Sequence, residues 1–288
     1  MSQNYQKVSF GKGENEYYLA VSPSSDEIKG ALILLPGFGQ LAETIFPESK
    51  IHNTAYANGL LTIGLGIGPK LYADQSVIDR INKAIAHMKE KYQLQANQFV
   101  IGGFSAGGTI SLAYTEHCYK NPSQSPIQPK GVFSVDSPVD LFHIWDYFER
   151  ELERNYSEAG ISEAKYVMNL MQEEIGNPVD QKSTYETLTP FHMDDLAMGN
   201  EQYLQKPAVR VYHELDIHWL IHNRRRSLID TNALAASELI NRLVQQGNEQ
   251  AEFMLSEEAG HRSNGMRHPH SWSIVNELDL IQWVKKIL

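Results

Sequence analysis

The sequence predicts an α/β fold, in which a mostly parallel central sheet is covered by helices on both faces. Short, almost continuously apolar runs alternate with segments of helical periodicity along the chain. Runs of this kind are typical of strands that are buried on both faces. The chain has 288 residues, 42% of them hydrophobic, which suits one large domain with a substantial core. We therefore expect a single domain over residues 1–288.

The strands are predicted from their apolar runs. The N-terminal segments KVSF and EYYLAVS, separated by GKGEN, predict an antiparallel hairpin at the edge of the sheet. Six further runs predict buried strands: residues 31–35, 60–65, 99–102, 131–135, 208–212 and 251–255.

The helices between these runs are predicted from apolar residues that recur every three or four positions. One such series is Val77, Ile81, Ile85, Met88 and Tyr92. A second is Leu234, Leu239, Leu243 and Val244. The last helix is expected to begin at Ser271 as its N-cap and to bury Val275, Leu278, Ile281 and Val284.

The link between the strands predicted at 131–135 and 208–212 is far longer than a single crossover helix requires. We expect residues 141–206 to form an inserted helical cap. Within it, one amphipathic helix is predicted by Val167, Leu170, Met171 and Ile175, starting at Ser162 and ending before Gly176 and Pro178. Its aromatic and methionine side chains could line a substrate pocket or pack the cap against the rest of the domain. These side chains are Trp145, Tyr147, Phe148, Met168, Met171, Phe191 and Met193.

Charge and composition exclude several classes of protein. The formal net charge of −10 repels phosphate backbones and anionic lipid headgroups, so neither nucleic acid nor a membrane surface is an expected partner. No stretch has the roughly 18 apolar residues of a membrane span, and the start, MSQNYQKVSFGKG, has no signal-like apolar segment. Cys118 is the only cysteine, which excludes intramolecular disulfides. We expect a cytoplasmic protein, unless an export signal has been removed.

One short motif points to nucleophilic catalysis. Residues 103–107, Gly-Phe-Ser-Ala-Gly, match G-x-S-x-G, a pattern that occurs by chance in about one chain of this length in ten. Its position adds weight, because it directly follows a predicted strand and opens the helical segment ISLAYTEH. Such a sharp turn exposes the hydroxyl of Ser105 above the sheet. The alternative is a turn of small residues that packs a helix tightly against a strand.

The motif GFSAGG, with the order of elements around it, resembles the nucleophile elbow of α/β-hydrolases, in particular their esterase and serine-peptidase branches. The resemblance implies the α/β-hydrolase fold, with Ser105 as nucleophile. It also implies a triad in the chain order serine, acid, histidine. In such a triad the histidine takes the serine proton and the acid orients the histidine.

The expected base is His261 in the segment EAGHR, because it follows the last predicted strand, where the superfamily places this residue. His268 and His270, in RHPH, are the competing histidines.

The expected acid is Asp216, which follows the strand predicted at 208–212. Asp136 is the alternative, because some relatives hold the acid one strand earlier. Glu214 and Asp140 also remain candidates. Any of them could instead be an ordinary N-cap or turn carboxylate.

The oxyanion that develops on the substrate needs preorganised N–H donors. The resemblance implies the amide of Ala106 and an amide from the loop after the first core strand, Pro36-Gly37-Phe38-Gly39. Phe38 is the first choice for the second donor and Gly39 the next. The superfamily often has His-Gly at this place, whereas this chain has Pro-Gly.

These residues predict a serine hydrolase that cleaves a small or medium carboxylic ester through an acyl-enzyme, without cofactor or metal. A peptidase acting on short peptides, or a thioesterase, could use the same triad. A catalytically inactive binding protein is the alternative from another class. Residues 37–42 also fit the dinucleotide fingerprint G-x-G-x-x-A, but the next predicted strand is followed by Gly68, Pro69 and Lys70 instead of the required acid. The sequence does not determine the oligomeric state.

A basic segment follows the predicted acid. Arg224, Arg225 and Arg226 lie just after His218, Trp219 and His222. They could form a solvated helix face, or a rim that attracts an acidic substrate group.

Overall fold

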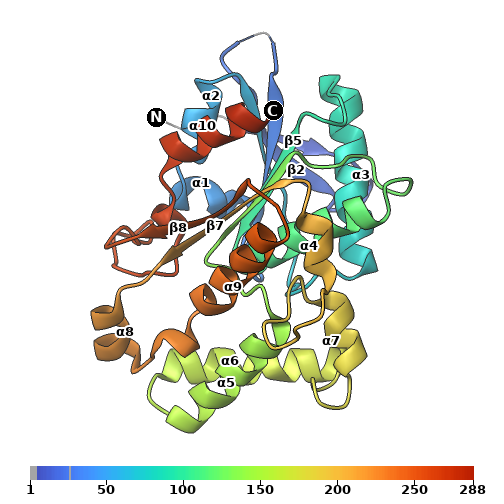
Figure 1. Cartoon of the computed structure of the whole chain (residues 1–288). Helices are drawn as coiled ribbons and strands as arrows, with labels where there is room; N and C mark the ends of the chain where they lie inside the picture. Colours follow the sequence, from blue (N-terminus) through green and yellow to red (C-terminus); the bar gives the residue numbers. More distant parts are fainter. Residues whose placement is uncertain (1–4, 26) are drawn as a thin grey trace.

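The computed structural model describes residues 5–25 and 27–288, so the first four residues of the start discussed above lie outside it. Within these ranges, eight strands form one sheet in the order β1-β2-β4-β3-β5-β6-β7-β8 (Figure 1). The strands are β1 (Gln6–Ser9), β2 (Tyr17–Val21), β3 (Gly30–Leu35), β4 (Leu60–Gly64), β5 (Phe99–Phe104), β6 (Gly131–Val135), β7 (Ala208–Glu214) and β8 (Ala251–Ser256). The β1–β2 hairpin is antiparallel and β2 pairs antiparallel with β4, whereas the strands from β4 to β8 run parallel. The predicted edge hairpin and all six further predicted strands are confirmed. Five of the six are buried as predicted, whereas β8 is the other edge strand and is only partly buried, with Leu255 55% exposed.

The two faces of the sheet are covered by different helices, as the alternation of side chains requires. In β3, Ile33 and Leu35 belong to the core under α3, α4 and α9, whereas Leu32 and Leu34 belong to the core under α1, α2 and α10. The helices of these two layers are α1 (Ile45–Glu48), α2 (Ile51–Tyr56), α3 (Gln75–Tyr92), α4 (Ala106–Lys120), α9 (Asn232–Gln245) and α10 (Glu277–Ile287).

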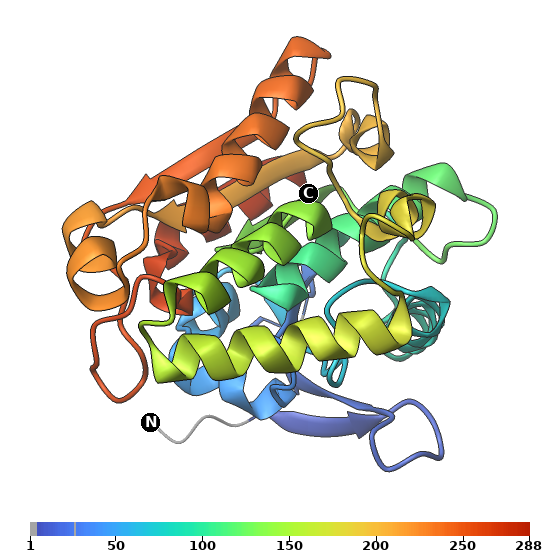
Figure 2. The same ribbon diagram turned by 90° about the horizontal axis from the view of Figure 1, so that it is seen from below.

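The segment between β6 and β7 is largely helical and lies at one end of the sheet. It contains α5 (Leu141–Arg154), α6 (Glu158–Glu174) and α7 (Lys182–Leu188), and α5 and α6 cross this end side by side (Figures 1 and 2). These helices share a buried apolar cluster that includes Trp145, Phe148, Met171 and Tyr185. Tyr72, which follows β4, joins the same cluster and connects the segment to the rest of the fold.

Two predicted helix starts are wrong because a stronger cap lies nearby. Helix α6 begins at Glu158, where the Ser157 side chain accepts a hydrogen bond from the amide of Gly160, and not at Ser162. Ser271 caps only a short 3-10 turn, and α10 begins after Asn276, whose side chain accepts from the amide of Asp279. In consequence Leu278, predicted to face inward, is 66% exposed.

The helical series on α9 also needs one correction, because Leu239 and Leu243 are buried but Val244 is 52% exposed. In residues 5–25 and 27–288, no helix combines the length and the apolar character needed to cross a membrane.

Candidate active site

Ser105 lies at a strained turn between β5 and α4, at the carboxyl end of the parallel strands. Its backbone has φ 54° and ψ −127°, a combination that L-residues rarely adopt and that is found at functional sites. The Ser105 amide donates to the carbonyl of Val135 on the neighbouring strand β6. Its side chain is partly exposed. The turn therefore presents the serine hydroxyl in the way that the sequence motif predicts.

The glycines of the motif are required by close backbone approach. A Cβ on Gly103 would lie 2.3 Å from the carbonyl carbon of Gly107, and a Cβ on Gly107 would lie 2.4 Å from the carbonyl oxygens of Leu35 and Pro36. Both distances are too short for any side chain. The turn can therefore form at this position only with glycine on both sides of the serine.

Asp136 lies near this turn, since it directly follows β6, the neighbour of β5, and lines the same cavity as Ser105. Its backbone also has a positive φ, 43°. Its Oδ2 accepts a 2.6 Å hydrogen bond from Nδ1 of His270, and its Oδ1 accepts one from Nδ1 of His213 at 3.1 Å. The side-chain amide of Asn232 donates to its carbonyl oxygen at 3.0 Å. The carboxylate is therefore held in a fixed orientation between two imidazoles.

This environment keeps Asp136 ionised. Burial by itself would raise the pKa of Asp136, but the electrostatic interaction with His270 and the hydrogen bonds from His213 and His270 hold it well below its usual range. An ionised Asp136 accepts the proton on Nδ1 of His270 in a hydrogen bond. The other ring nitrogen, Nε2, is then unprotonated and can accept a proton.

His270 lies beside the nucleophile turn. Its ring centroid is 4.5 Å from that of Phe104, the residue directly before Ser105. The structure therefore brings together a serine, a histidine and an aspartate from three loops, in the chain order Ser105, Asp136, His270.

These three residues line one cavity of about 330 Å³, a size that suits a small or medium ligand. Its other walls come from the helical segment between β6 and β7, including Tyr147, Phe148 and Met171, and from α8 (Ile217–Arg224) with Trp219 and Arg224. Three of the aromatic and methionine residues predicted for a pocket are thus in the wall. Phe191 instead packs in the core under α4 and α9.

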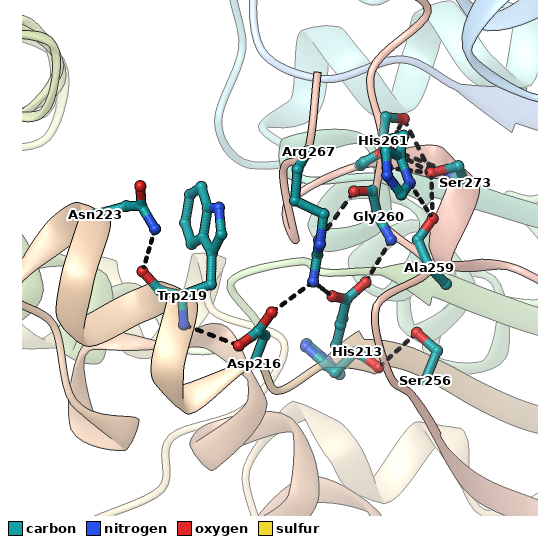
Figure 3. Close-up of polar contacts among 12 residues, drawn as sticks. His213, Asp216, Trp219, Asn223, Ser256, Ala259, Gly260, His261, Arg267 and Ser273 are labelled. Carbon is teal, nitrogen blue, oxygen red and sulfur yellow. Dashed lines mark hydrogen bonds and ion pairs between the residues drawn. The ribbon is translucent and has the colours of Figure 1, made fainter. Parts of the chain in front are cut away.

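The structure does not pair Asp216 with His261, as the sequence led us to expect. Asp216 caps α8 by accepting from the amide of Trp219 at 2.8 Å, and its other oxygen accepts from Arg267 at 2.9 Å (Figure 3). His261 is exposed, with Nδ1 3.2 Å from the carbonyl of Ala259 and its amide bonded to Ser273 (Figure 3). Among the cavity-lining residues that the structure describes, neither appears.

The physical reason is Arg267. Its guanidinium bonds to Glu214, Asp216 and the carbonyl of Gly260, while Glu214 also accepts from the amide of Gly260. These contacts hold both carboxylates at the end of β7 and connect them to the loop after β8. In the loop arranged in this way, His270 lines the cavity and His261 is not in the described lining.

Two of the three predicted oxyanion donors lie at the cavity that contains Ser105. Ala106, the first residue of α4, and Phe38 both line the cavity. In the described part of the chain, neither amide donates a hydrogen bond to another protein group. Gly39 is exposed and does not belong to the described cavity lining, which favours Phe38 as the second donor. Gln40 shapes this loop, because its side-chain oxygen accepts from the amide of Gly37.

A further histidine, His268, lines the cavity and packs edge-on against Trp219. Burial, together with electrostatic interactions with His270, Arg262 and Arg224, lowers the pKa of His268 to about 3. A pKa this low makes His268 a weak proton acceptor, which disfavours it as the base that shuttles the serine proton.

The three arginines of the basic segment have different surroundings. Arg224 and Arg226 line the cavity, and Arg226 pairs with Glu151. Arg225 is exposed at the end of α8, over the ring of Tyr156. The segment is thus neither wholly a solvated face nor wholly a rim.

Comparison with solved structures agrees with this architecture. Fluorophosphonate-binding serine hydrolase F of Staphylococcus aureus, solved with substrate bound, is 12% identical with a TM-score of 0.61, and the match covers 98% of both chains. Carboxyl esterase 2 of the fungus Tuber melanosporum is 15% identical with a TM-score of 0.62, covering 99% of this chain and 86% of that one. A truncated carbohydrate esterase from gut microbiota is 13% identical with a TM-score of 0.64, and the match covers 99% of this chain and 96% of that one. The chain has the α/β-hydrolase fold.

Within the α/β-hydrolase fold, Ser105 and the loops after β6 and β8 lie at the same end of the sheet, where open α/β sheets bind ligands. The fold implied by the sequence resemblance is confirmed. No protein-family model matches the chain, and no curated protein matches it by sequence.

Sequence reasoning missed three residues of this α/β-hydrolase site. They are His213 and Asn232, which bond to Asp136, and Arg262, which lines the cavity. His213 directly follows the strand predicted at 208–212 and is buried within β7. A polar residue that continues an apolar run is the signal that could have drawn attention to it.

Proposed function

We propose that this chain is a serine hydrolase that cleaves carboxylic esters, with Ser105 as nucleophile, His270 as base and Asp136 as acid. The observation that carries the proposal is the 2.6 Å hydrogen bond between Asp136 and His270, in the cavity that also contains the strained Ser105. The esterase names of the structural neighbours are consistent with it.

In the first half-reaction, Nε2 of His270 accepts the proton of the Ser105 hydroxyl as Oγ attacks the ester carbonyl carbon. Asp136 holds the Nδ1 proton of His270 and stabilises the imidazolium that forms. Nε2 then returns its proton to the leaving alcohol, and the acyl group remains on Oγ. In the second half-reaction, Nε2 of His270 takes a proton from water as its oxygen attacks the acyl carbonyl carbon. Nε2 then returns that proton to Ser105 Oγ as the acyl–Oγ bond breaks, which releases the carboxylic acid and restores the serine.

The negative charge of each tetrahedral intermediate needs hydrogen-bond donors. We assign this role to the amides of Ala106 and Phe38, which line the cavity. Ala106 is also the first residue of α4, and a helix N-terminus favours negative charge.

The first test is intact mass after treatment with a fluorophosphonate, comparing the wild type with Ser105→Ala. We expect one adduct on the wild type and none on the variant, because labelling needs the nucleophile, the base and the oxyanion donors together. Labelling of both proteins would show that the reagent reacts elsewhere. Absence of an adduct on the wild type would favour a binding protein without catalytic activity.

The second test separates the two candidate bases. His270→Ala is expected to lower the rate of 4-nitrophenyl butyrate hydrolysis by roughly 10³-fold or more. His261→Ala, in an exposed loop outside the described cavity lining, is the matched control and should retain nearly full activity. The reverse pattern would transfer the role of base to His261.

A further inference from the structure

Two guanidinium groups in the cavity have no carboxylate partner. Arg262 lines the cavity, and in residues 5–25 and 27–288 its side chain forms neither a hydrogen bond nor an ion pair. Arg224 also lines it and bonds only weakly to the hydroxyl of Ser157, at 3.3 Å, while its guanidinium lies over the ring of Trp219. Partly buried arginines are normally paired, so these two are available to a ligand.

The remaining charged groups of the described lining are mostly neutralised by the protein. The ion-pair partners are Arg267 for Glu214, Arg150 and Arg154 for Asp230, and Glu151 for Arg226. Asp136 is hydrogen-bonded to His213 and His270. Glu163, an exposed residue of α6, has no hydrogen bond or ion pair among the described residues. Among the described lining residues, Arg262 and Arg224 are thus the guanidinium groups without an ion pair, and Asp136 and Glu163 are the carboxylates without an Arg or Lys partner. Asp136 is already held by two imidazoles, so Glu163 is the one carboxylate of the described lining without a hydrogen-bond or ion-pair partner.

Arg262 is close to the reacting groups. Its guanidinium carbon lies 5.6 Å from the ring centroid of Phe104, the residue before Ser105, and the same ring packs against His270. Arg262 also interacts electrostatically with Glu48, Asp136 and Glu163, without a direct ion pair to any of them in the described residues. Both Arg262 and Arg224 lower the pKa of His268. The two cations therefore surround the same part of the cavity as His268 and His270.

The cavity also contains polar atoms without partners. Nδ1 of His268 and Nε2 of His143 are buried and form no hydrogen bond in the described chain. A buried imidazole nitrogen without a partner is unfavourable, and a polar ligand that bonds to it removes this penalty. A purely apolar ester would leave both nitrogens and both guanidinium groups unsatisfied.

We propose that the cavity selects esters that carry a carboxylate or a similar compact anionic group, bound by Arg262 and Arg224. This inference rests on the proposed esterase function and specifies its substrate class. A planar guanidinium is suited to carboxylate because it can donate two parallel hydrogen bonds.

The substrates for the test are two pairs that differ only in charge. For the acyl side, 4-nitrophenyl hydrogen adipate is compared with 4-nitrophenyl methyl adipate. For the alcohol side, 4-carboxyphenyl butyrate is compared with its methyl ester at the benzoate carboxyl group. The variants are Arg262→Gln, Arg262→Lys and Arg224→Gln. Arg225→Gln is the matched control, because Arg225 is exposed beyond the described cavity lining.

We expect the wild type to have a higher kcat/KM for the anionic member of at least one pair, by about tenfold or more. Arg262→Gln should lower this preference by roughly 10- to 100-fold while changing hydrolysis of the neutral member little. Arg224→Gln should also lower the preference for the anionic ester, and Arg262→Lys should retain part of it. Arg225→Gln should leave kcat/KM for both members of each pair unchanged. High salt should reduce the preference of the wild type.

A second readout needs no turnover. Monomethyl adipate should slow fluorophosphonate labelling of Ser105 in the wild type but not in Arg262→Gln, and dimethyl adipate should not slow it in either. If Arg262→Gln fails to fold, Arg224→Gln and the salt dependence of the wild type provide the same comparison.

The inference is overturned if the wild type has the same kcat/KM for both members of each pair and monomethyl adipate does not slow labelling of Ser105. It is also overturned if Arg262→Gln lowers kcat/KM equally for both members of a pair, since that result indicates a structural role. Failure of the proposed function looks different, because the wild type would then neither hydrolyse the neutral esters nor react with the fluorophosphonate.

Discussion

Replacing Asp136 by asparagine should abolish most of the activity without unfolding the protein. The substitution preserves size but removes the charge that accepts the 2.6 Å hydrogen bond from His270. An asparagine can present its NH₂ group to Nδ1 of His270 and so favour the wrong tautomer. The imidazolium that forms during acylation also loses its counter-ion. In serine proteases the corresponding change lowers kcat by about 10⁴-fold, or about 5 kcal/mol of transition-state stabilisation.

The matched control is Asp216→Asn, the acid expected from the sequence. Asparagine is as good an N-cap as aspartate, so the cap of α8 should survive. Arg267 would lose one ion pair but keep Glu214. Because Asp216 and Arg267 are 19% and 23% exposed, that loss should lower the free energy of unfolding by no more than about 1 kcal/mol. Hydrolysis should remain within about threefold of the wild type.

The assay is steady-state hydrolysis of 4-nitrophenyl butyrate by both variants, with urea unfolding to confirm that each is folded. Asp136→Asn should lose activity in kcat, because the interaction acts in the transition state. A nearly wild-type Asp136→Asn together with an inactive Asp216→Asn would refute the assignment of the acid. Loss of both activities, with both proteins folded, would mean that Arg267 and its carboxylates also position the reacting groups.

Three further predictions concern stability. Gly107→Ala places a Cβ 2.4 Å from two carbonyl oxygens and should lower the free energy of unfolding by about 1–3 kcal/mol in urea unfolding; Gly66→Ala, whose nearest contact is 3.7 Å, is the control and should change it little. His268 has a pKa lowered from 6.5 to about 3, so the unfolded chain takes up its proton first as the pH falls, and stability decreases below pH 6.5. Between pH 7.5 and 5 this group should account for up to about 2 kcal/mol, and equal losses in wild type and His268→Gln would contradict it. Burial and the charge of Glu201 raise the pKa of Glu116, so the free energy of unfolding should fall as the pH rises above 4.5. Glu116→Gln should remove this pH dependence. Parallel pH profiles of stability for the wild type and the variant would contradict the prediction.

The fold was predictable because its signals are local. Strands β3 to β7 are almost wholly buried, and burial on both faces requires the apolar runs that the sequence contains. The turn at Ser105 was predictable for a related reason, since the glycines that permit it are adjacent to it in the chain.

The acid and the base were not predictable in this way. Several sets of the candidate residues satisfy the order serine, acid, histidine, among them Ser105 with Asp216 and His261, and Ser105 with Asp136 and His270. The choice depends on Arg267, whose bonds to Glu214 and Asp216 span more than fifty residues of sequence. No local pattern indicates which histidine of a loop is turned toward a cavity when the loop is fixed by such distant ion pairs.

The proposed acid, Asp136, directly follows β6, which neighbours the strand that leads to Ser105. This position bears on how the substrate preference of the protein can change through substitutions. Glu214 and Asp216 at the end of β7 then take no direct part in proton transfer and act on the site only through Arg267 and the loop after β8. Helix α8 supplies cavity wall but none of the proposed triad, so substitutions at Trp219 or Arg224 are expected to change which molecules enter the cavity more than the bond-breaking step. Part of the selectivity can therefore change through one helix, whereas Arg262, in the same loop as His270, couples the rest of it to the reacting groups.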